Sequence, residues 1–279
     1  MLQMIPAFII LTAVIFYGAM LAPAAPTLPR PTHIMLFEYI SGIFQGDLGM
    51  SARFRRPVIS LVSGALPYTA ILTFGSISVA SVLGVFLGIV AAVKQNKLTD
   101  NIIMVFSLIF SSIPIFFLAV LLMLVFSLYL GLLPSRGLDG WQGMIMPIMT
   151  LALPSVGFIA RTTRAAMLEV LTMDSIKAAR ARGISERSVI FSHGLRNIQL
   201  PVITAIALRL AELLSGAVLV ELAFSIPGIG RLVQQALIDR DLYLMMGCIV
   251  VLAFAFMIIN LLVDLIYIIV DPRTKKSLR

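Results

Sequence analysis

The sequence is short of charged residues and of cysteine. Charged residues make up 12% of its 279 residues, hydrophobic residues make up 60%, and the mean hydropathy is +1.05. A water-soluble chain needs a larger charged surface, so the long apolar runs cannot all form one core surrounded by water. The single cysteine, Cys248, lies inside an apolar run, which excludes an intrachain disulfide framework and a cysteine metal cluster. The sequence therefore predicts an integral membrane protein of the all-α class.

Catalytic motifs are also lacking. The phosphate-binding pattern GxxxxGK[ST], the zinc pattern HExxH and the nucleophile pattern GxSxG do not occur in the chain. The two histidines, His33 and His193, are expected on opposite sides of the membrane, so they cannot share a metal ion. The formal charge of +8 does not indicate nucleic acid, because Lys and Arg stand between apolar runs rather than in one stripe with aromatic residues. We expect no enzymatic activity, no metal site and no cofactor site in this chain.

Six apolar runs are long enough to cross about 30 Å of hydrocarbon at 1.5 Å per helical residue. Pro114 is expected to kink or interrupt the third run, because proline removes a backbone hydrogen bond. Gly84 and Gly88 form a GxxxG pattern in the second run, which predicts close approach of another helix. The six runs cover residues 4–21, 68–93, 101–133, 144–160, 201–224 and 242–270.

The chain divides into four parts. Residues 1–22 are expected to form the first transmembrane helix, because no basic segment and no suitable cleavage site mark them as a signal peptide. Residues 23–67 are expected to form an extracytoplasmic loop in which 37–44 and 57–64 lie on the membrane surface. A five-helix core then fills 68–270, and a basic cytoplasmic tail covers 271–279.

Residues 161–200, which we call the coupling loop, form the one long polar passage within the core. The loop carries seven Lys or Arg residues against three acidic ones, and the positive-inside rule places it in the cytoplasm. Over the whole chain, this topology puts thirteen Lys or Arg residues inside and seven outside. Helix-forming residues lead up to Gly183, which predicts a short helix ending there, and Ser185 could cap a second helix that runs towards Asn197.

The coupling loop resembles the EAA loop of ABC importer permeases. The resemblance rests on Lys177-Ala178-Ala179, on Gly183 and on the Leu200-Pro201 pair, although Lys177 stands where that motif has glutamate. The longer spacing from Gly183 to Pro201 is similar to that of the peptide and nickel permeases. The likeness extends over nearly the whole chain, through GDLG at 46–49, RPV at 56–58, LP at 66–67, FSIPGIGR at 224–231, RD at 240–241, NLLVD at 260–264 and DPR at 271–273.

The resemblance implies a function and a set of partners. The chain would be a permease subunit of an ATP-driven importer of dipeptides, oligopeptides or nickel, and would form half of the translocation pathway. It would pair with a second, homologous permease, with two ATPase subunits that bind ATP and Mg²⁺, and with an extracytoplasmic substrate-binding protein. It would reside in a bacterial or archaeal plasma (inner) membrane as a multi-pass protein in contact with lipid, with both termini in the cytoplasm. The residues implied in ATPase coupling are Lys177, Ala178, Ala179, Arg182, Gly183, His193, Arg196 and Pro201.

Four residues inside the apolar runs are candidates for the translocation path. Arg209 and Glu212 are three residues apart, so they share a helix face and could pair with each other or face the path. Ser112 and Pro114 could line the path, or Pro114 could serve only as a kink. The alternative function is a secondary transporter or channel subunit without ATPase partners, but neither ion-coupling sites nor an internal repeat is visible.

Overall fold

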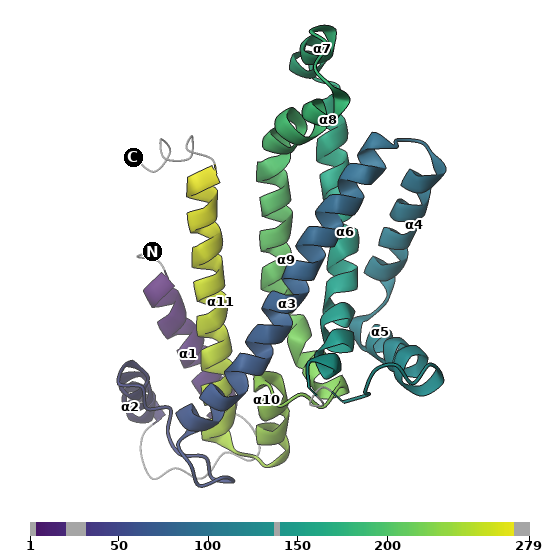
Figure 1. Ribbon diagram of the computed structural model, residues 1–279. Helices are drawn as coiled ribbons and strands as arrows, with labels where there is room; N and C mark the ends of the chain where they lie inside the picture. Colours follow the sequence, from purple (N-terminus) through teal and green to yellow (C-terminus); the bar gives the residue numbers. More distant parts are fainter. Residues whose placement is uncertain (1–3, 21–31, 137–139, 271–279) are drawn as a thin grey trace.

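The computed structural model describes residues 4–20, 32–136 and 140–270, and within them the protein is helical (Figure 1). Apart from an isolated bridge between Met50 and Pro57, these residues contain no strand pairing. The expected all-α class is therefore confirmed. The helices are α1 Met4–Met20, α2 Thr32–Phe44, α3 Val58–Val93, α4 Leu98–Ser112, α5 Ile115–Leu122, η1 Met123–Tyr129, η2 Trp141–Met144, α6 Ile145–Leu171, α7 Asp174–Ala181, α8 Glu186–Ser188, η3 Val189–Gly194, α9 Leu195–Ala223, α10 Ile229–Ile238 and α11 Leu242–Val270.

Four helical stretches of the described chain are long and apolar enough to cross a membrane, or five if the pair α4 and α5–η1 counts as one broken span. They contain α3, α6, α9 and α11. The first expected span corresponds to α1, whose 17 residues are fewer than the about 20 that usually cross a bilayer. The count of six crossings therefore stays a prediction.

Helices α3, α6 and α9 form the centre of the molecule (Figure 1). Helix α6 is the most enclosed, with 61% of its apolar stretch buried, against 11% for α11. The expected GxxxG contact is present: a Cβ added to Gly84 would lie 2.8 Å from Ile159, and one added to Gly88 would lie 2.6 Å from the Ala160 carbonyl oxygen. The two glycines thus let α3 and α6 approach closely.

The break at Pro114 is confirmed and is larger than a kink. Helix α4 ends at Ser112, Pro114 has an extended backbone, and α5 leaves at an angle of 108° to α4. In Figure 1, α5 accordingly lies across the end of α6 rather than continuing the line of α4.

Two expected boundaries of the core are wrong. Residues 57–64 do not form a separate segment, because α3 begins at Val58, and Val58 and Val62 are buried against α10 and α11. The fifth span does not begin at Pro201, because α9 starts at Leu195 and carries this proline in its interior. Membrane helices tolerate such prolines when neighbouring groups satisfy the freed backbone carbonyl.

The coupling loop is also shorter than expected, because α6 continues to Leu171 and includes Arg161 and Arg164. Helix α7 projects from one end of the molecule, and α2 and α10 lie at the opposite end (Figure 1). The first turn of α1 and the last turn of α11 both point towards the α7 end (Figure 1). The expected basic tail at 271–279 lies outside the described residues, as do residues 23–31 of the expected outer loop.

Candidate coupling and translocation surfaces

Helix α7 has one face packed on the protein and one face open. Ile176 and Ala179 are buried in an apolar cluster with Met167, Val189 and Ile198, which come from α6, η3 and α9. Ile176 and Ala179 are three residues apart, which is about one helical turn, so the remaining positions of α7 point outward. The outward positions include Lys177, Ala178 and Arg182.

The turn after α7 follows the pattern expected from Gly183. This glycine has φ +78°, a left-handed conformation that favours glycine, and Ile184 N–H donates to the Ala179 carbonyl at 3.3 Å. An ion pair between Arg180 and Glu186, 2.6 Å apart, then closes the turn; no pattern in the sequence predicted this pair. The hydrogen bond to Glu186 raises the pKa of Arg180 above its usual value. Helix α7 is thus held in a fixed orientation by packing below and by charge at its end.

Seven of the eight residues implied in ATPase coupling are exposed at this end of the molecule. They are Lys177, Ala178, Arg182, Gly183, His193, Arg196 and Pro201. The eighth, Ala179, is only 2% exposed and packs beneath α7, so its side chain has no access to a partner. The expectation that Ala179 fits a groove on the partner is therefore corrected, because the helical period turns this position inward.

The expected pair on α9 is present. Arg209 Nη1 lies 2.5 Å from Glu212 Oε2, and the Arg209 guanidinium stacks over the Phe158 ring with its carbon 4.1 Å from the ring centre. The Arg209 side chain is 22% exposed, whereas that of Glu212 is 62% exposed. A carboxylate so open to its surroundings cannot face hydrocarbon without a large cost, so this face of α9 requires water or protein beside it.

The other two path candidates do not join this pair. Ser112 is exposed and its hydroxyl donates to Leu108 of its own helix, while Pro114 starts the turn into α5. The neighbouring Ser111 does take part in a polar contact between helices, because Arg161 Nη2 donates to its hydroxyl at 3.1 Å. Arg161 Nη1 also donates to the Ser107 carbonyl at 2.8 Å. Sequence reasoning missed Arg161, because its run of polar neighbours resembled the start of the cytoplasmic loop.

A second contact missed by sequence reasoning joins α4 to α6. Asp100 is 1% exposed and accepts two hydrogen bonds from Arg164, at 2.6 and 2.7 Å. Asp100 also accepts from the backbone N–H of Asn96 at 3.0 Å. The two residues are too far apart in the sequence for a local pattern to predict their pairing, which fixes the end of α4 nearest α7 against α6 (Figure 1).

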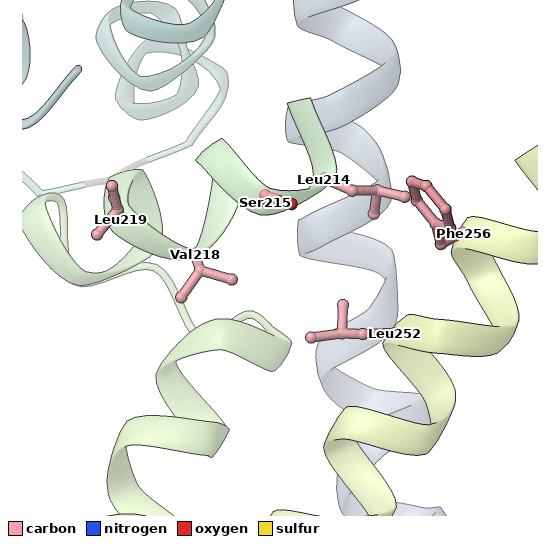
Figure 2. A pocket seen from close by; sticks show the side chains of 6 residues that line it. All are labelled: Leu214, Ser215, Val218, Leu219, Leu252 and Phe256. Atoms are coloured by element: carbon pink, nitrogen blue, oxygen red, sulfur yellow. The ribbon is translucent and has the colours of Figure 1, made fainter. Parts of the chain in front are cut away.

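The exposed face of α9 continues past Glu212 to a cavity between α9 and α11. This cavity has a volume of 390 Å³, and Figure 2 shows Leu252 and Phe256 of α11 facing the α9 residues across it. Ser215, one turn beyond Glu212, supplies the only hydroxyl among the residues that line this cavity. The lining residues are Leu214, Ser215, Val218, Leu219, Leu252 and Phe256.

The described residues contain no group of three His, Cys, Asp or Glu side chains that could hold a metal ion.

The family model and the similar proteins found by comparison all belong to transport systems. Residues 84–276 match the model of the binding-protein-dependent transport system inner membrane component. The glutathione transport system permease protein GsiC of Escherichia coli O6:H1 is 39% identical over 245 residues, which cover 88% of this chain and 80% of that protein. A putative peptide transport system permease protein of Brucella abortus is 38% identical over 256 residues, or 89% of this chain and 82% of that protein. An inward-facing structure of the MetNI methionine ABC transporter matches with a TM-score of 0.66 at 23% identity, over 76% of this chain and 97% of that one, and shows likeness of fold.

Proposed function

Because this chain belongs to the family of binding-protein-dependent transport system inner membrane components and is a permease subunit of an ABC importer, we propose that its cargo is a small peptide. The observation that carries the proposal is the Arg209–Glu212 pair on the open face of α9. A peptide has an ammonium group, which Glu212 can bind, and a carboxylate, which Arg209 can bind. The relatives named for peptide and glutathione transport support the same class of cargo.

The two ends of the molecule would then bind different partners. An ATPase subunit docks on the exposed side of α7, and a substrate-binding protein delivers the peptide at the opposite end, where α10 lies (Figure 1). A second, homologous permease with its own ATPase completes the complex and covers the exposed face of α9. The ATPases bind ATP and Mg²⁺, and this chain contributes no cofactor. The protein spans the inner membrane. We place both termini on the cytoplasmic side, because the first turn of α1 and the last turn of α11 point towards the α7 end (Figure 1).

Uptake into proteoliposomes tests this function. The complete complex, reconstituted with ATP on the α7 side, should accumulate a labelled dipeptide only when both ATPases and the binding protein are present. The matched control is the same complex with an ATPase variant that binds ATP without hydrolysing it. Uptake that persists without ATPase subunits would overturn the proposal in favour of a secondary transporter or channel, and uptake of nickel but not of peptide would overturn the cargo.

A further inference from the structure

Arg161 carries a positive charge within a membrane-spanning helix and has only neutral acceptors. Its two hydrogen bonds go to the Ser107 carbonyl and the Ser111 hydroxyl. Among the described residues, no carboxylate forms an ion pair with it, in contrast to Arg164 one turn along the same helix, which Asp100 neutralises. Its side chain is partly exposed, so a ligand can reach it.

Arg209 adds a second guanidinium to the same place. Its guanidinium stacks on Phe158, which lies on the turn of α6 that precedes Arg161, so the two arginines stand at the same contact between α6 and α9. The Nε atom of Arg209 is buried and has no hydrogen-bond partner in the described structure, so its donor group is unused. The cluster therefore holds two guanidinium groups but one carboxylate, that of Glu212, and carries one surplus positive charge.

A surplus charge at this depth has a cost that a bound anion would remove. Insertion of an unpaired arginine into the hydrocarbon of a bilayer is unfavourable, and two guanidinium groups near each other also repel. Planar guanidinium groups with free donors match the two oxygens of a carboxylate. The Phe158 ring holds the guanidinium of Arg209 in a fixed plane. A bare metal cation would be repelled by the same surplus charge, so the cluster disfavours nickel.

We propose that Arg161 and Arg209 together form a carboxylate-binding site that receives the C-terminal carboxylate of a peptide during its passage. This inference rests on the proposed function, because it requires that peptides enter the face of α9. Arg161 approaches from α6 and Arg209 from α9, so a bound carboxylate would bridge two helices of the core. Glu212, on the outer side of Arg209, is free to receive the peptide ammonium group by exchange of its partner.

The test compares one peptide with its C-terminal amide, which lacks the negative charge but keeps the side chains. Uptake of both forms is measured in proteoliposomes with the complete complex, for the native chain, Arg161→Gln, Arg209→Gln and Arg161→Lys. Since the binding protein is the same throughout, only a change in the ratio of the two uptake rates reports on this chain. We expect each glutamine variant to lower uptake of the free acid about ten- to a hundredfold relative to the amide, the range for a hydrogen bond to a charged group. Arg161→Lys should retain most of the preference.

The outcomes separate this site from a structural role and from failure of the proposed function. A structural latch between α6 and α4 predicts that Arg161→Gln lowers membrane abundance and both uptake rates equally, with an unchanged ratio, and that result would overturn the proposal. Arg209→Gln gives the same comparison at a second position if Arg161→Gln does not accumulate. Arg136→Gln, at an exposed outer turn, should change nothing. ATP-driven uptake of neither peptide form by the native complex would overturn the proposed function and this site together.

Discussion

At the scale of single residues, Glu221 shows how one buried carboxylate can join three helices. It is 0% exposed, accepts from the Thr69 hydroxyl at 2.6 Å and from the Gly230 N–H at 2.7 Å, and so links α9 to α3 and to the start of α10. Thr69 in turn accepts from the Ile229 N–H at 3.0 Å. These contacts satisfy backbone donors in the first turn of α10, where a negative charge is favoured.

Gly228 leaves the space that this carboxylate occupies. A Cβ at Gly228 would lie 2.1 Å from the Glu221 carboxyl carbon, so Gly228→Ala should displace the carboxylate and destabilise the α10 end of the protein by about 1–3 kcal/mol. The measurement is the thermal unfolding midpoint of the purified complex. Gly64→Ala is the matched control, because Gly64 lies on an exposed side of α3 with no atom within 4 Å of the added Cβ. Equal midpoints for the two variants would show that the Glu221 contact is not required there.

Residue patterns predicted a contact only where the two partners were close in the sequence, or where small residues indicated close approach of another helix. The Arg209–Glu212 pair followed from helical spacing, and the Gly84 and Gly88 contact followed from the GxxxG pattern. The pairs Asp100–Arg164 and Thr69–Glu221 are 64 and 152 residues apart, and no local pattern connects such positions. Their existence depends on how α3, α4, α6 and α9 pack.

At the scale of helices, hydropathy located the apolar runs but not their ends. Helix α3 begins ten residues before the expected position, because Val58 and Val62 pack on α10 and α11, and a helix packed on protein need not end at the bilayer surface. Helix α6 continues through Arg161 and Arg164 for a related reason, since both side chains donate hydrogen bonds to α4, Arg161 to the Ser107 carbonyl and Arg164 to the Asp100 carboxylate. Tertiary partners therefore decide the boundaries that polarity alone would place earlier or later.

The role of α7 in docking an ATPase can be tested at two adjacent alanines, because one faces outward and the other faces the protein interior. Ala178 is exposed, so Ala178→Trp should leave the chain folded but block the close docking of an ATPase, and uptake should fall about tenfold or more. Ala179 is buried, so Ala179→Trp should instead disrupt the packing beneath α7 and reduce membrane abundance. Abundance, ATPase co-purification and uptake are measured for both variants. Normal uptake in Ala178→Trp would remove α7 from the coupling contact.

At the scale of the whole molecule, the exposed face of α9 is incompatible with lipid alone. Glu212 is 62% exposed, and Ser215 follows one turn later at the cavity between α9 and α11 (Figure 2). The outward faces of α4, in contrast, expose apolar side chains such as Ile109, which hydrocarbon can solvate. The molecule therefore has one side suited to lipid and another that requires a second permease, water or cargo.

Under the proposed function, cargo passes along this face of α9 under the control of ATPases bound at α7. The direct measurement is the reaction of a water-soluble, membrane-impermeant thiol reagent with Ser215→Cys in the complete complex, with and without trapped ATP. The native Cys248 is 0% exposed and should give little background, and Ile109→Cys on α4 is the control for a position that faces lipid. We predict that Ser215→Cys reacts and that its rate changes when ATP is trapped, while Ile109→Cys stays unreactive. Equal reactivity at the two positions, unchanged by nucleotide, would contradict the account.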